Sequence, residues 1–156
     1  ITKVKSLKEL TPAIKHAFSY GNEIVIETNI KGREVTNGIF RNKEGLKTLP
    51  ITEIISENEY FDYEAKYNGK SKEITPAEIN EEQTQNIKSL TNFIYKTLGM
   101  NGLVRMDYIV NENNIPFLIE INSVPGMSKE SIIPQMIKED NKLIKDVLSD
   151  IINLKF

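Results

Sequence analysis

The sequence contains no cysteine and no tryptophan, and its 156 residues include a single histidine, His16. Without cysteine, a disulfide framework and a thiolate metal site are excluded within this chain. No apolar run approaches the roughly 20 residues of a membrane span, and no segment resembles a signal peptide. Lys and Arg total 20 against 22 Asp and Glu, a net charge of −2. Such a balance does not favour a nucleic-acid or anionic membrane partner, so a cytoplasmic location is the default expectation.

The chain begins at Ile1 rather than Met, already in strand-like sequence, which suggests a fragment. Helix and strand patterns are interspersed, and they predict an α+β fold with a mostly antiparallel sheet flanked by helices. The expected strands are a strand end at 1–4 and strands at 23–28, 33–42 and 51–56, and residues 60–79 are expected to be a strand end followed by an exposed loop. One helix is expected from N-cap Thr11 and Pro12 to Gly21. A long helix would be opened by a capping pair of Asn80 and Gln83 and closed by Gly99, and a final helix would span 141–154.

Two apolar runs on either side of the tetrapeptide NENN (residues 111–114) predict a β-hairpin. With Val110 opposite Ile115, Arg105 would directly face Glu120. Because side chains alternate along a strand, one face of the hairpin would carry four polar groups: Arg105, Asp107, Glu120 and Asn122. The opposite face would carry core residues: Val104, Met106, Tyr108, Phe117, Ile119 and Ile121.

This polar face has the ligands that Mg²⁺ prefers. Asp107, Glu120 and Asn122 offer carboxylate and amide oxygens, and opposed Cβ atoms lie only about 5 Å apart. The alternative is a solvated strand face with one cross-strand Arg–Glu pair, and the hairpin pattern alone favours neither reading. The continuation NSVPGM favours a site, because a Pro-Gly turn would direct backbone N–H groups toward the oxygen cluster.

Three segments, in this order, resemble the D-alanine–D-alanine ligase family of ATP-grasp enzymes: IVIETNIKGREVT, YFDYEAKYNGKSKEITPAEI and GLVRMDYIV…FLIEINSVPGMSKESIIP. The resemblance covers nearly the whole chain. It implies ATP-dependent ligation of two D-alanine molecules, through an acyl phosphate, for peptidoglycan precursor synthesis in the cell wall. It also implies that residues 1–30 are the tail of the central nucleotide-binding subdomain and that 31–156 are the C-terminal ATP-grasp domain.

The resemblance implies roles for the polar face and the turn after it. Asp107, Glu120 and Asn122 would hold two Mg²⁺ ions, with Mn²⁺ as an alternative ion, against the ATP phosphates. Arg105 and the backbone N–H of Gly126 would stabilise the oxyanion of the tetrahedral intermediate. Glycine suits position 126 because it permits close backbone approach and a positive φ.

The resemblance also implies where the second substrate and the phosphates bind. Ser131 and Ile132, at a helix N-terminus, would seat the carboxylate of the second D-alanine. On physical grounds alone Ser131 could equally be a plain N-cap, and the two roles are compatible. Lys66 would contact phosphate and contribute to catalysis, and Tyr67 would border the second substrate.

For the nucleotide, the resemblance implies a hinge that receives adenine, followed by a ribose-binding carboxylate at Glu34. The hinge consists of Glu27, Thr28, Asn29 and Ile30. The residues alone would favour strand-end surface charges for both glutamates. Family members carry further phosphate-binding segments and an N-terminal domain upstream, through which the parent enzyme is expected to form a homodimer. This piece alone is therefore expected to be inactive.

Two other readings remain open. Another ATP-grasp carboxylate–amine ligase would share the hairpin, although SKESIIP and DYEAKY would not be expected together. A non-catalytic, divalent-metal-binding β module would share the carboxylate face, but it offers no reason for Lys66 or for IETNIKGRE. The acceptor is also open among D-alanine, D-lactate and D-serine.

Overall fold

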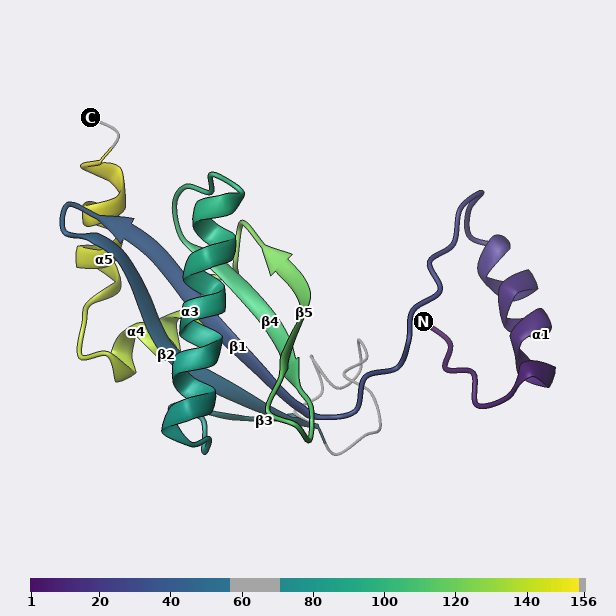
Figure 1. The fold of residues 1–156 in the computed structure, drawn as a ribbon. Coiled ribbons are helices and arrows are strands. Elements are labelled where there is room, and N and C mark those ends of the chain that lie inside the picture. The colour runs from purple at the N-terminus through teal and green to yellow at the C-terminus, as the bar shows by residue number, and fades with distance from the viewer. Residues whose placement is uncertain (57–70, 155–156) are drawn as a thin grey trace.

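The computed structural model describes residues 1–56 and 71–154 (Figure 1). Five strands form one sheet in the order β3-β2-β1-β4-β5, with every neighbouring pair antiparallel. The α+β prediction is confirmed. In chain order the elements are α1 (Leu7–Phe18), β1 (Arg33–Asn42), β2 (Gly45–Ser56), β3 (Ser71–Ile74), α3 (Glu81–Thr97), β4 (Val104–Val110), β5 (Pro116–Asn122), α4 (Ile132–Glu139) and α5 (Ile144–Ile152).

Helix α3 covers one face of the sheet (Figure 1). Its predicted capping box is confirmed: Asn80 Oδ1 accepts from the Gln83 N–H at 2.8 Å, and Gln83 Oε1 accepts from the Asn80 N–H at 3.1 Å. The buried side of α3 packs onto alternate residues of the strands, each contributing about 1.5–3 kcal/mol on burial. This first core cluster is Val35, Ile39, Ile51, Ile87, Tyr95, Val104, Met106, Tyr108 and Val110.

Helices α4 and α5 pack against β2 and β1. They form a second core cluster of Phe40, Leu49, Ile54, Ile132, Ile133, Met136, Ile137 and Val147. Gly38 permits this close approach, since a Cβ there would lie 2.8 Å from Ile133 Cδ1 and from Leu49 Cδ1. The candidate site lies on the polar face of the β4–β5 hairpin, where the side chains of Arg105 and Asp107 are largely buried and that of Glu120 is exposed.

The N-terminal segment differs most from prediction. Helix α1 begins at Leu7 rather than after Thr11, because Ser6 and Glu9 form the local start signal: Glu9 accepts from the Lys5 N–H at 2.8 Å and from Ser6 Oγ at 3.1 Å. Pro12 therefore lies inside the helix.

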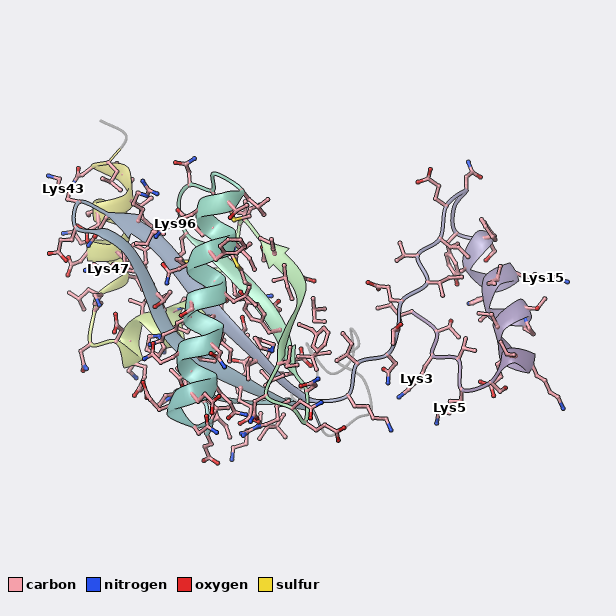
Figure 2. All side chains as sticks on the ribbon, viewed as in Figure 1. Lys3, Lys5, Lys15, Lys43, Lys47 and Lys96 are labelled. Atoms are coloured by element: carbon pink, nitrogen blue, oxygen red, sulfur yellow. The ribbon has the colours of Figure 1, made fainter. Side chains whose placement is uncertain are left out.

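The strands predicted at 1–4 and 23–28 are wrong, and both stretches are irregular. A strand pairs with a neighbouring strand through its backbone, and neither stretch is a strand of the described sheet. No residue of 1–32 is buried. Figure 1 shows α1 apart from the sheet, and Figure 2 shows Lys3, Lys5 and Lys15 projecting from this segment.

Several predicted strand and helix boundaries differ from those of the structure. The strand predicted at 33–42 is confirmed, whereas the one at 51–56 is the end of the longer β2. Residues 71–74, predicted to lie in an exposed loop, form β3, because Glu53 and Ile54 of β2 offer a free edge for pairing. The final helix is shorter than predicted. None of the helices in the described ranges is long and apolar enough to cross a membrane.

Candidate functional site

The β4–β5 pairing brings the four predicted polar residues onto one face. Asp107 lies opposite Glu120, and Arg105 lies opposite Asn122. Opposed residues in an antiparallel pair share a face, so the predicted common face is confirmed. The other face of β4 is buried, as expected, at Val104, Met106, Tyr108 and Val110.

The predicted register of the hairpin is wrong. Val110 pairs with Pro116 rather than Ile115, because Asn111 Oδ1 accepts from the Ile115 N–H at 2.9 Å and draws that residue into the turn. A bulge then inserts Ile119 as an extra residue on β5, between the partners of Tyr108 and Asp107.

The bulge reverses the facing of β5 near the turn. Phe117 pairs with Ile109 and so lies on the Asp107 face rather than the predicted core face, and Leu118 takes the core side opposite Tyr108. The two shifts together keep Glu120 and Asn122 on the polar face. The prediction reached the right face with the wrong pairing.

Strand β1 adds a residue that the sequence analysis missed. Thr36 lies opposite Asp107 and is fully buried, and its Oγ1 donates to Asp107 Oδ1 at 2.5 Å. Alternation along β1 places Glu34 on the same face. The alternating pattern of residues 33–42 predicts the strand itself. It does not predict that this strand pairs with β4, the pairing that brings Thr36 to Asp107.

Arg105 forms a bidentate ion pair with Asp107, two residues along the same strand. Nε donates to Asp107 Oδ1 at 2.9 Å, and Nη2 donates to Oδ2 at 2.7 Å. Nη2 lies 3.7 Å from Glu120 Oε1, a longer contact than a direct pair. Burial lowers the pKa of Arg105, but the hydrogen bond and charge of Asp107 and the charge of Glu120 raise it on balance. Arg105 is therefore a fixed cation on this face.

The face carries more negative than positive charge. Glu34, Asp107 and Glu120 are three carboxylates around one guanidinium. Burial raises the pKa of Glu34, as do the charges of Asp107 and Glu120, while Arg105 opposes them. A field of this sign attracts a cation.

The donor set fits a hard divalent cation. Glu120 is 59% exposed and open to a ligand, and Asp107 Oδ2 has one lone pair beyond its bond to Arg105. Carboxylate and amide oxygens are ligands of Mg²⁺ and Mn²⁺. Among residues 1–56 and 71–154, no three His, Cys, Asp or Glu side chains are placed to hold a metal. A cation held by Asp107 and Glu120 would therefore need Asn122 and oxygens from outside the protein to complete its coordination.

The turn after β5 brings Gly126 against Ser131. A Cβ at position 126 would lie 2.8 Å from Ser131 Oγ, so close approach explains the glycine. Gly126 is not among the glycines with a positive φ, so close approach alone accounts for it. Ser131 begins α4, as predicted, but its side chain makes no capping hydrogen bond and instead lies 2.8 Å from Ser128 Oγ. Ile132, the first helical residue, is buried.

The remaining predicted residues lie apart from this cluster. Lys66 and Tyr67 lie outside the described residues. Ile30, the last residue of the predicted hinge, lines a cavity of about 520 Å³ together with Lys31 and Phe117. This linker cavity lies between residues 30–32, the linker that precedes β1, and the β4–β5 turn. The other three hinge residues are exposed side chains of the irregular segment: Glu27, Thr28 and Asn29.

Comparisons with known proteins agree with this architecture. A family model described as "D-ala D-ala ligase C-terminus" matches residues 1–153. The D-alanine–D-alanine ligase of Bacteroides fragilis is 46% identical over the whole chain, which covers 48% of that relative. The VanG D-Ala:D-Ser ligase from Enterococcus faecalis superposes with a TM-score of 0.83 at 30% identity, over 99% of this chain and 45% of that one. A D-alanine–D-alanine ligase from Bacillus anthracis complexed with ATP superposes with a TM-score of 0.76 at 27% identity. The match covers 96% of this chain and 47% of that one.

The antiparallel sheet with an acidic hairpin face is the C-terminal fold of ATP-grasp ligases. Within that class, the chain belongs to the D-ala D-ala ligase C-terminus family. It spans about half the length of the relatives it matches.

Proposed function

We propose that the full-length protein joins two D-alanine molecules with ATP and that this chain supplies the metal–nucleotide site and the acceptor site. The observation that carries the proposal is the shared face of Asp107, Glu120 and Asn122 beside Arg105. The family supports the reaction, and the Bacillus anthracis structure contains ATP. The product would serve peptidoglycan synthesis in the cytoplasm.

The oxygen face would bind nucleotide through metal. Asp107, Glu120 and Asn122 would hold two Mg²⁺ or Mn²⁺ ions, which would neutralise charge on the transferring phosphoryl group. Lys66 would contact phosphate. Glu34 would bind the ribose hydroxyls, which is consistent with its place on the same face.

The hinge would bind adenine through its backbone, at residues Glu27, Thr28, Asn29 and Ile30. The hinge precedes β1 by two residues. Adenine bound at the hinge would therefore lie near the linker cavity, and the phosphates would extend toward the oxygen face. We place the tail of the nucleotide subdomain at 1–30 and the C-terminal domain at 31–156. Dimer contacts would come from the part of the protein upstream of this chain.

The acceptor would bind at the start of α4. The Ser131 hydroxyl and the backbone N–H of Ile132 would hold its carboxylate, since the Ser131 N–H already donates to the Ser128 carbonyl at 2.9 Å. Tyr67 would border the acceptor. Gly126 N–H and a guanidinium nitrogen of Arg105 would stabilise the oxyanion as the acceptor amine attacks the acyl phosphate. The attack forms the C–N bond and releases phosphate, and the amine proton passes to solvent.

The metal role is tested by Glu120→Gln in the full-length protein. We expect D-alanine-dependent phosphate release to fall by roughly 100-fold or more, since one charged ligand is lost. The fold should persist because Glu120 is largely exposed. Glu82→Gln, an exposed acid in the first turn of α3, is the matched control and should keep turnover within about twofold. Near-normal turnover in Glu120→Gln would refute the assignment.

The acceptor is tested in the same assay with D-serine and D-lactate in competition. We expect D-alanine to be the preferred acceptor. Because the VanG relative is a D-Ala:D-Ser ligase, preference for D-serine would revise the acceptor while leaving the metal–nucleotide site in place. Phosphate release that depends on none of the three would refute the ligase proposal.

A further inference from the structure

One hydrogen-bonded bridge on the site side of the fold has no role in the reaction as described. Gln135, in α4, donates through Nε2 to Glu73 Oε2 at 2.7 Å and to the Glu130 carbonyl at 3.2 Å. Glu73 belongs to β3 and Glu130 to the turn before α4. A single amide nitrogen thus joins an edge strand, a helix and the turn between β5 and α4.

The bridge holds the residue next to the proposed acceptor seat. Glu130 immediately precedes Ser131, and Gln135 lies one helical turn after Ser131, with its own N–H directed to the Ser131 carbonyl at 3.4 Å. Residues 126–130 are all exposed, so hydrogen bonds hold this turn. The Ser131 N–H donates to the Ser128 carbonyl at 2.9 Å, the two serine hydroxyls lie 2.8 Å apart, and Gln135 connects the Glu130 carbonyl to β3.

The other end of the bridge faces the site. Glu73 pairs with Ile54 of β2, and Ile54 packs beneath α4 in the second core cluster. The charge of Glu73 also contributes to raising the pKa of Arg105. A bond from an amide to an ionised carboxylate is stronger than one between neutral groups. β3 is therefore a firm anchor for the start of α4.

We propose that Gln135 and Glu73 form a positioning pair that sets affinity for the acceptor amino acid. This inference rests on the proposed function. Losing the bridge would let Glu130 and Ser131 move relative to β3, while the buried Ile132 side chain and the proposed metal-binding hairpin stay in place.

The experiment measures steady-state kinetics of the full-length protein with Gln135→Met, which keeps the side-chain length and removes the donor. We expect the KM for the second D-alanine to rise roughly tenfold, as for loss of one charge-assisted hydrogen bond. The KM for ATP and kcat should stay within about twofold. Glu73→Met should give the same KM rise, and the double variant should be no worse than either single one.

Two further variants separate positioning from general stability. Glu73→Gln keeps an acceptor oxygen for Gln135 and should recover most of the acceptor affinity lost in Glu73→Met. Gln85→Met removes an amide–carboxylate bond of the same kind, from Gln85 Nε2 to Glu81 Oε1 at 2.7 Å on the exposed side of α3. It should leave all kinetic constants unchanged.

Hydrogen exchange supplies a readout independent of activity. The backbone amides of 130–132 should exchange faster in Gln135→Met than in the wild type, and those of β4 should not. An unchanged acceptor KM in an active enzyme would overturn the inference, as would an equal rise in the KM for ATP. A wild-type protein with no D-alanine-dependent turnover would instead overturn the proposed function, and unchanged exchange at 130–132 would overturn the bridge itself.

Discussion

The carboxylate of Asp107 is held from two sides by protein donors. Thr36 Oγ1 and Arg105 Nε reach Oδ1, and Arg105 Nη2 reaches Oδ2. These bonds fix the side-chain torsion and leave the open lone pair of Oδ2 directed away from Thr36. A ligand held this way loses little conformational entropy when it binds a cation. Thr36 is the donor that remains if Arg105 turns toward a substrate.

Thr36→Val tests this role. The substitution keeps the side-chain shape but removes the donor to Asp107, so we expect Mn²⁺ affinity, measured by titration of the full-length protein with ATP present, to fall about tenfold. Thr36→Ser keeps the hydroxyl and should retain affinity within about threefold. Wild-type Mn²⁺ affinity in the valine variant would show that Arg105 alone orients the carboxylate.

Among the elements, the start of β1 is joined to its neighbours by one ion pair. Arg33 donates Nε to Glu53 Oε1 at 2.7 Å and Nη2 to Oε2 at 2.6 Å, and also bonds the Glu78 carbonyl at 2.7 Å. The Glu53 side chain is 8% exposed and that of Arg33 is 42% exposed. The pair therefore fixes β1, β2 and the segment before α3, and Glu53 depends on Arg33 more than the reverse.

Arg33→Met should reduce the free energy of unfolding by about 3 kcal/mol, because it leaves a buried carboxylate unpaired. Urea denaturation of the chain measures this value. Adding Glu53→Met to the same variant should restore much of the loss, since the buried charge is then gone. A double variant less stable than Arg33→Met would contradict the asymmetry.

At the scale of the whole molecule, the described core excludes the N-terminal segment. Both core clusters lie between Val35 and Val147. Helix α1 buries no side chain, and large apolar residues of 1–30 are exposed, including Phe18, Tyr20 and Val25. Residues 1–30 therefore contribute little burial energy to the fold of this chain.

Deleting residues 1–30 should consequently change the Tm of the chain by less than about 4 °C in differential scanning calorimetry, equivalent to roughly 1 kcal/mol. Ile87→Ala, which removes a fully buried side chain of the first cluster, should lower the Tm by about 5–15 °C. A loss on deletion as large as that of Ile87→Ala would show that the segment stabilises the sheet.

Features encoded by neighbouring residues were predictable. The bounds of β1 and the capping box at Asn80 follow from alternation and capping, which act within a few residues. The common face of Arg105 and Asp107 also follows, since side chains alternate along a strand and positions two apart share a side. The same local logic was available for α1 in Ser6 and Glu9, and it was overlooked.

Features that depend on which segments meet in space came only with the folded chain. Strand order placed Thr36 beside Asp107, a side-chain bond in the turn moved Ile115 out of β5, and the bridge from Gln135 spans 62 positions to Glu73. Local pattern specifies which faces are apolar, whereas pairing between distant strands is set by the packing of the whole core. The arrangement of site residues that come from different strands was therefore decided by the tertiary structure.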